Sequence, residues 1–152
     1  MSEVFIRNSS GDIQGSANVG KIFIEDGKIY KIVQNGEAST AIAAGDVLVY
    51  ESAADDTVNI SSAAGQKQVA GVAVEAIAAG EFGRMLIFGY ATGVKVDGGT
   101  TDVGQYAVLG TGGAAGYAYT TSTQGAALGI CMDTVTAKTT TGTKVFVKTL
   151  GL

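Results

Sequence analysis

The amino-acid sequence repeats itself with a period of about 59 residues. The segment GDVLVYESAADDTVNIS, which begins at Gly45, matches GQYAVLGTGGAAGYAYT, which begins at Gly104. Two further pairs follow in the same order, AGVAVE with LGICMD and GRMLIFGYA with GTKVFVKTL. Each copy of such a repeat is one supersecondary unit that cannot bury its apolar face alone. Two copies therefore predict one closed β-domain.

Each copy divides into four short apolar runs that are separated by Gly, Thr, Asn or Asp. Several runs alternate apolar and polar residues with the period of two that is typical of strands. Eight short strands at close spacing indicate a barrel or a sandwich. The expected fold is all-β, a small closed or partly open barrel of the β-tulip kind. The eight predicted strands lie at 46–50, 57–61, 69–75 and 84–91 in the first copy, and at 105–109, about 117–119, 127–133 and 143–150 in the second.

A β-hairpin is predicted ahead of the repeats. The dipeptide Asp26-Gly27 joins two β-rich runs in KIFIEDGKIYKIV, and this dipeptide favours a type I′ turn because both central positions need positive φ. That turn fixes the register of the hairpin. The expected facing pairs are Glu25 with Lys28, Ile24 with Ile29, and Phe23 with Tyr30.

The chain is expected to have three parts. Residues 1–20 are polar and small and form an extended N-terminal arm, and residues 21–37 form the hairpin. Residues 38–152 form the β-domain, with repeats at about 41–96 and 100–152. Within it, AIAAGD and AIAAGE each end in glycine and an acid just before a strand, so we expect the same turn at both places.

Missing residue types restrict the chemistry. The chain has no histidine, which excludes an imidazole base or a histidine metal ligand. Cys131 is the single cysteine, so the chain has no internal disulfide and no paired thiolates, and its apolar strand predicts a buried, inert thiol. The net charge is −4 and no basic stripe occurs, which argues against a nucleic-acid partner. No signal peptide or long apolar run is present, so we expect synthesis in a cytoplasm and no membrane partner.

Three motifs suggest sites, and comparison of the two repeats weakens each. GTGGAAG at Gly110 precedes a strand rather than the helix that a dinucleotide site needs. Asp55 and Asp56 offer two oxygen ligands where calcium takes six to eight. Glu75 and Asp133 occupy the same repeat position, where turn capping explains both without acid–base catalysis. We therefore expect no catalytic residues, cofactor, metal or small-molecule substrate.

The repeats resemble those of capsid decoration proteins of tailed bacteriophages, the small head-stabilising or cement proteins with a β-tulip fold. The matching residues are 41–50, 71–75 and 78–88, and they recur between 104 and 150. The resemblance implies a homotrimer on the outside of the virion capsid, where it binds the major capsid protein and stabilises the expanded shell. It also implies that the N-terminal arm lies along the capsid protein and contributes to binding it.

In this chain the capsid-binding part of the arm is expected to be Val4, Phe5, Ile6 and Arg7. This run is apolar in alternate positions and can add a strand to the edge of a neighbouring sheet. A frayed terminus, or a strand of the chain's own barrel, explains the same residues. The hairpin between the arm and the first repeat has no counterpart in the family pattern.

Other classes of function remain open at the level of sequence. A tail-tube protein, a fibre protein or a carbohydrate-binding module fits the same composition, in which charged residues are only 16%. A small hydrolase that works with carboxylates alone is the alternative from the enzyme class.

Overall fold

A computed structural model describes residues 18–51, 56–62, 69–96, 103–108, 115–121, 127–134 and 139–149. The predicted arm residues Val4–Arg7 and most of the glycine-rich segment at Gly110 lie outside these ranges. The expected all-β class and the partly open barrel are confirmed, and the strands form a ring that is not a regular barrel. The strands are β1 (Ile22–Glu25), β2 (Lys28–Asn35), β3 (Val47–Tyr50), β4 (Thr57–Ile60), β5 (Val69–Ala73), β6 (Phe82–Val96), β7 (Tyr106–Val108), β8 (Tyr119–Thr121), β9 (Ala127–Cys131) and β10 (Thr139–Lys148).

The predicted hairpin is confirmed as β1 and β2. Its register pairs Phe23 with Tyr30, Ile24 with Ile29 and Glu25 with Lys28. Asp26 and Gly27 have φ of 50° and 74°, as a turn with two positive φ angles requires. Glu25 faces Lys28 as expected, and its carboxylate also lies 3.8 Å from the Arg84 guanidinium on β6.

The order of strands in the sheet mirrors the sequence repeat. It reads β1-β2-β4-β3-β5-β6-β10-β9-β7-β8. The first repeat contributes β4-β3-β5-β6, and the second contributes the equivalent strands in the opposite order, β10-β9-β7-β8. The two repeats meet where β6 pairs with β10. An additional pairing of β2 with β6 closes the strands β2, β4, β3, β5 and β6 into a ring. We call this the first ring. The hairpin strand β2 is therefore part of it.

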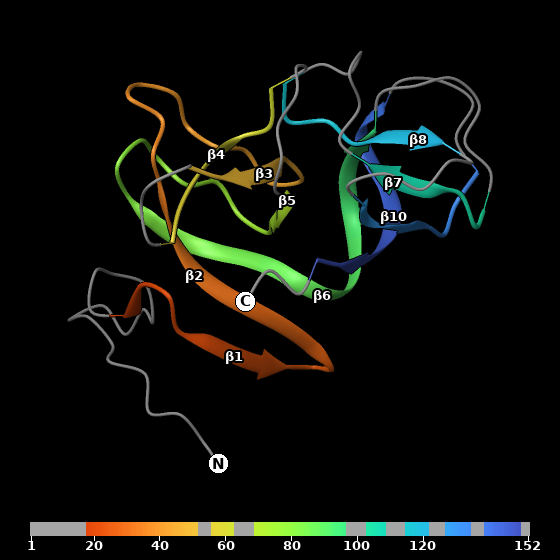
Figure 1. The fold of residues 1–152 in the computed structure, drawn as a ribbon, viewed down its shortest axis with the longest axis horizontal. Helices are drawn as coiled ribbons and strands as arrows, with labels where there is room; N and C mark the ends of the chain where they lie inside the picture. Colours follow the sequence, from red (N-terminus) through yellow and green to blue (C-terminus); the bar gives the residue numbers. More distant parts are fainter. Residues whose placement is uncertain are drawn as a thin grey trace.

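A second ring is built from the C-terminal half of β6 with β10, β9, β7 and β8. A single parallel bridge, Val96 with Ala118, joins β6 to the residue that precedes β8. In the first ring β2 likewise runs parallel to β4. The C-terminal half of β6 thus takes the place in the second ring that β2 takes in the first. Figure 1 shows the two groups of strands side by side, with β6 running along the first and bending into the second.

Glycines allow β6 to serve both rings. Gly89 and Gly93 have φ of 118° and 104°, a region that side chains with a Cβ rarely adopt. The register with β10 shifts between Thr143 and Val145, opposite Val94 and Ala91, which places an extra residue of β6 there. A bulge of this kind bends a strand and increases its twist. The sharp bend of β6 follows from it.

Two apolar clusters fill the molecule. Alternate residues of the first ring's strands form one cluster, which includes Val33, Leu48, Met85 and Ile87. Residues on the opposite face of the same strands join a larger cluster that continues into the second ring. Members of this larger cluster from the first ring are Tyr30, Ile32, Val47, Val72 and Leu86, and members from the second are Val94, Val96, Ala107, Ala118, Leu128, Cys131, Val145 and Val147.

Candidate functional site

The twin acids of the repeat have matching structural roles. Glu75 Oε1 accepts a hydrogen bond from the backbone N–H of Arg84 at 2.9 Å, and Asp133 Oδ2 accepts one from the backbone N–H of Lys144 at 2.9 Å. Glu75 also accepts two hydrogen bonds at 3.2 Å from the Arg84 guanidinium. These hydrogen bonds, and the negative charge of Glu75, raise the pKa of Arg84. Each acid therefore caps the turn that leads into the next strand, as the sequence comparison predicted.

The two AIAAG turns are also equivalent, as predicted. The N–H of Asp46 bonds to the carbonyl of Ala43, and the N–H of Glu81 bonds to that of Ala78. Gly45 and Gly80 have positive φ at the same position of each turn. The two segments pair with each other through the isolated bridge of Ile42 with Ile77.

The remaining candidates from the sequence are structural where the structure describes them. Asp56 forms an ion pair with Lys31 of β2. Burial lowers the pKa of Lys31, but the hydrogen bond to Asp56 and the neighbouring Tyr50 outweigh this effect and raise it. Cys131 is fully buried, and desolvation, with a contribution from Asp133, raises its pKa to about 11. In the described part of the chain, no three acidic, Cys or His side chains gather where a metal could bind.

A buried ion pair fastens the two rings together. Lys95 of β6 donates to Asp46 Oδ1 at 2.5 Å, and the Asp46 side chain is 5% exposed. The other carboxylate oxygen accepts the N–H of Ala43 at 2.7 Å. Gly116 lies against this acid, and its carbonyl accepts the N–H of Val47 at 2.9 Å. The segment before β8 is thus held between β3 and β6.

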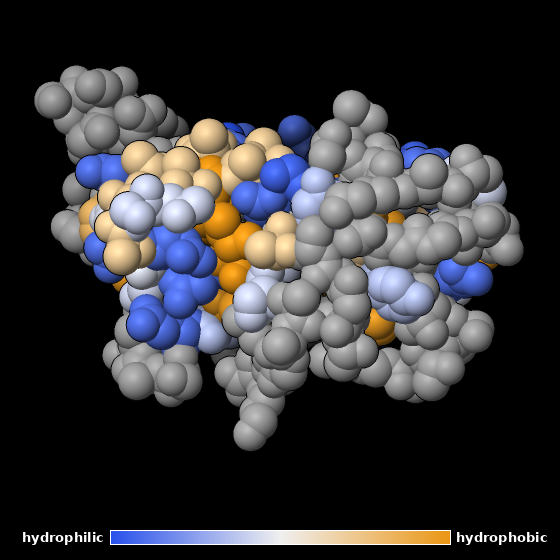
Figure 2. All heavy atoms as spheres, turned by 90° about the horizontal axis from the view of Figure 1, so that it is seen from above, coloured by the Kyte–Doolittle hydropathy of each residue, from blue (hydrophilic) through white to orange (hydrophobic). Residues whose placement is uncertain are grey.

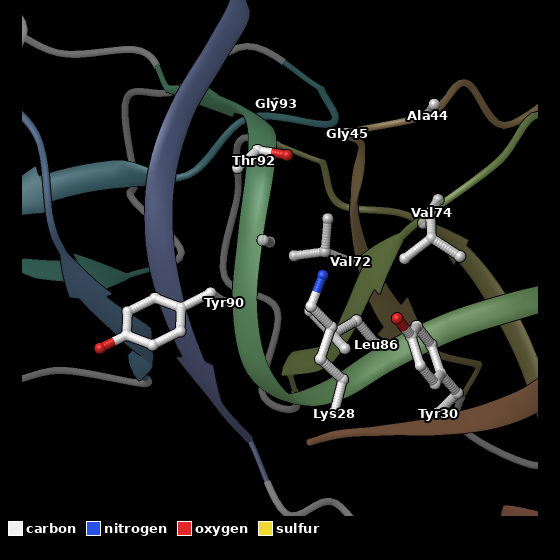
Figure 3. A pocket seen from close by; sticks show the side chains of 12 residues that line it. Lys28, Tyr30, Ala44, Gly45, Val72, Val74, Leu86, Tyr90, Thr92 and Gly93 are labelled. Atoms are coloured by element: carbon white, nitrogen blue, oxygen red, sulfur yellow. The ribbon is translucent and has the colours of Figure 1, made fainter. Parts of the chain in front are cut away.

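A pocket of about 410 Å³ lies in the bend of β6. Its apolar wall includes Val72, Leu86 and Ala91, and the backbone of the Gly45 turn forms another side. Figure 3 shows the ammonium of Lys28 and the hydroxyl of Tyr30 reaching into this space. Lys28 forms no ion pair with another described residue. Two hydrogen-bond donors above an apolar wall suit a small anionic group.

Tyr30 keeps its proton in this pocket. Burial, and then the charge of Glu25, raise the pKa of Tyr30 above its usual value, while Arg84 opposes the shift. The hydroxyl is therefore protonated at neutral pH and acts as a hydrogen-bond donor. Among the residues that line the pocket, none is a carboxylate, histidine or cysteine.

The outer face of the second ring has a row of large side chains across four strands. Tyr90, Phe146, Ile130 and Tyr106 are neighbours in register on β6, β10, β9 and β7, and we call them the aromatic row. Tyr90 is 46% exposed and Ile130 is 40% exposed. The rings of Tyr90 and Phe146 meet edge to face with their centroids 4.9 Å apart. The ammonium of Lys144 lies 5.4 Å from the centre of the Tyr90 ring.

Sequence reasoning missed both the pocket and the aromatic row. The signal for the row was the alternation of Lys144, Phe146 and Lys148 within one strand, which indicates a face open to water. The pocket had no such signal, because it depends on the bend of β6. On the face seen in Figure 2, a narrow apolar strip lies beside separate polar groups of the described residues. No helix among those residues is long and apolar enough to cross a membrane.

Comparison with solved structures gives a likeness of fold. No protein-family model matches the chain, and no curated protein matches its sequence. Among solved structures, the N base of the head fibre protein gp8.5 of bacteriophage phi29 is similar, with a TM-score of 0.50 and 18% identity. The similarity covers 81% of this chain and 98% of that structure. At this identity the likeness is one of fold, and it spans almost the whole of the head-fibre base.

Proposed function

We propose that this chain is a structural protein of a bacteriophage virion. The observation that carries the proposal is the fold likeness to the base of a phage head fibre, which includes 98% of that base. The sequence repeats independently resemble those of phage decoration proteins. Two separate kinds of comparison thus favour the same class of protein.

The finer proposal is that the chain attaches to the outside of a capsid and stabilises the expanded shell. Its N-terminal arm, with Val4, Phe5, Ile6 and Arg7, would bind the major capsid protein by adding a strand to an exposed sheet edge. The arm leads directly into the hairpin β1–β2, whose second strand pairs with β4 and β6. Tension on the arm would therefore be carried into the first ring.

The two rings suit a protein that carries mechanical load and catalyses no reaction. Closing strands into rings removes most of the free edges that would otherwise template aggregation. The shared strand β6 and the ion pair between Asp46 and Lys95 join the two rings into one body. If three copies assemble, as the resemblance implies, each trimer would engage several capsid subunits, and multivalency would convert modest affinity per arm into tight occupancy.

Co-sedimentation with expanded capsids that lack the protein tests the proposal. We expect the full chain to move with the capsids at a saturable ratio. A variant with Phe5→Ser and Ile6→Ser should bind much less, whereas a control with Ser9→Ala and Ser10→Ala in the same arm should bind as the full chain does. Equal binding of both variants would refute the role of the arm. Failure of the full chain to bind would refute capsid attachment.

The fold likeness favours a second candidate, the base of a head fibre. It shares attachment to the head but differs in purpose, because a base anchors a projecting part rather than strengthening the shell. Resistance of decorated capsids to heat or chelator separates the two. A cement protein raises the temperature at which the shell breaks, and a fibre base leaves it unchanged.

A further inference from the structure

The pocket in the bend of β6 combines buried apolar residues with an opening to water. Val72, Leu86 and Ala91 line it and are 2%, 1% and 6% exposed. Ala44 and Thr92 also line it and are exposed. Its volume of about 410 Å³ lies in the lower part of the range that ligand pockets span, about 300 to 1,000 Å³. The pocket therefore has room for a small ligand that enters from solvent.

Comparison of the two repeats shows why the first ring has room here. Leu86 and Val72 are neighbours in register on β6 and β5, and Phe146 and Ile130 are neighbours in register on β10 and β9. Each residue of the first pair precedes its counterpart in the second by 58 to 60 residues. The first ring thus has the smaller side chain at both positions. Smaller side chains on this face leave space that the larger pair would fill.

Lys28 supplies a positive charge to the pocket. Its aliphatic stem lies against Gly89, where an added Cβ would be 3.0 Å from the Cγ of Lys28. Its ammonium points into the pocket (Figure 3) and forms no ion pair with another described residue. The carboxylate of Glu25, which faces Lys28 across the turn, lies 3.8 Å from the Arg84 guanidinium. The residue 60 positions after Lys28 is Phe88, so the repeat does not account for the cation.

Tyr30 supplies a second donor beside Lys28. Its ring is held by stacking on Phe23, with the centroids 5.2 Å apart, and its hydroxyl reaches into the same space (Figure 3). A tyrosine that is largely buried usually has a hydrogen-bond partner for its hydroxyl. The lining includes no acidic side chain. An ammonium and a protonated hydroxyl without a nearby acid favour a ligand with negative charge.

We propose that this pocket binds a carboxylate that is carried on a short apolar group. The carboxylate accepts hydrogen bonds from the Lys28 ammonium and the Tyr30 hydroxyl. The apolar group packs against Val72, Leu86 and Ala91, where its burial is favourable. Inorganic phosphate is a poorer ligand, because it would place charged oxygens against the apolar wall.

Two sources carry this chemistry, a free carboxylic acid and the C-terminal residue of a partner protein. Both present a carboxylate next to a small apolar group. The site is separate from the N-terminal arm and does not depend on capsid binding.

Titration of the folded protein with hexanoate, followed by its backbone amide signals in nuclear magnetic resonance, tests the proposal. We expect saturable shifts of the signals of Gly45, Ala91 and Gly93, with a Kd of about 1 mM. Hexanol has a similar apolar chain without the charge, and acetate has the carboxylate without the chain. Each should bind at least about 10-fold more weakly than hexanoate.

Four variants assign the contacts. Lys28→Met removes the ammonium and should raise the Kd for hexanoate about 10-fold or more, and Tyr30→Phe removes only the hydroxyl and should raise it about 3-fold. Ala91→Leu fills the pocket and should abolish binding. Lys144→Met is the matched control, because it removes an exposed lysine from the outer face of the second ring and should leave the Kd unchanged. Thermal unfolding checks that each variant is folded.

A pair of peptides distinguishes the two sources. One acetylated peptide ends in Ala-Leu with a free carboxylate, and the other has the same sequence with a C-terminal amide. Binding of the acid peptide that exceeds that of hexanoate and is lost in the amide assigns the site to the C-terminus of a partner protein. Binding of hexanoate without binding of either peptide assigns it to a free carboxylic acid.

Four results would overturn the proposal. Hexanoate that binds no more tightly than hexanol shows that Lys28 does not recognise a carboxylate. Inorganic phosphate that binds as tightly as hexanoate shows that the apolar wall does not select the ligand. Shifts that persist in both Lys28→Met and Ala91→Leu place the bound acid elsewhere. Absence of a saturable shift up to about 10 mM hexanoate removes the site.

Capsid co-sedimentation is measured separately. Its failure refutes only the proposed function and leaves the carboxylate site intact.

Discussion

One methyl group at Gly129 of β9 is expected to destabilise the protein strongly. A Cβ added there would lie 1.9 Å from the carbonyl oxygen of Phe146 and 2.8 Å from its carbon, where ordinary contact begins at 3.4 Å. The obstacle is the backbone of β10, which must move by about 1.5 Å. A shift of that size breaks the neighbouring hydrogen bonds between β9 and β10, worth about 1 kcal/mol each. Overpacking adds about 1 to 3 kcal/mol.

We therefore expect Gly129→Ala to lower the free energy of unfolding by about 3 to 4 kcal/mol. For a chain of this length that corresponds to a fall in Tm of roughly 6 to 16 °C. Gly80→Ala is the matched control. Gly80 has a positive φ of 76° and nothing within 4 Å of an added Cβ, so only the backbone conformation costs about 1 to 2 kcal/mol. The assay is thermal and urea unfolding followed by circular dichroism.

The equivalent substitution in the first repeat extends the test. A Cβ at Gly71 would lie 2.4 Å from the carbonyl oxygen of Leu86. Because both rings share β6, Gly71→Ala and Gly129→Ala should lower one common transition. The reasoning is refuted if Gly129→Ala costs no more than Gly80→Ala. Two separate transitions would show that β6 does not couple the rings.

Three further predictions follow from the contacts between strands. Asp46→Ala should cost about 3 kcal/mol, because it leaves Lys95 partly buried without its partner; urea unfolding checks this, and a loss below about 1 kcal/mol contradicts it. The Cys131 thiol should resist a thiol reagent until the chain unfolds. Because its pKa is raised in the folded state to about 11, the free energy of unfolding should fall as pH rises from about 9 toward 11, and it should fall less in Cys131→Ala. Glu75→Gln and Asp133→Asn should each cost about 1 kcal/mol as caps, and a hydrolase screen should give no turnover that depends on either acid.

The repeat made the strands predictable. Eight runs recurred with their turn residues, so strand positions and the twin AIAAG turns followed from local chemistry. The hairpin register followed from the single dipeptide Asp26-Gly27. The internal comparison also assigned structural roles to Glu75 and Asp133, which the hydrogen bonds of the folded chain confirm.

The parts that could not be predicted depend on contacts between distant residues. β2 looked like an addition to the repeat, but the C-terminal half of β6 takes its place in the second ring, and only pairing in three dimensions reveals that equivalence. The pocket arises from the bend of β6, and the ion pair of Asp46 with Lys95 joins residues 49 apart. The different exposure of Tyr30 and Tyr90 depends on what packs above each strand. A strand's own sequence does not contain this information.

Electron cryomicroscopy of expanded capsids incubated with the protein tests the central claim most directly. The account predicts added density on the outer surface at the three-fold and quasi-three-fold positions, into which three copies of the two-ring body fit. Capsids with no added density, or density confined to the tail, would contradict the claim that this chain is a component of the head exterior.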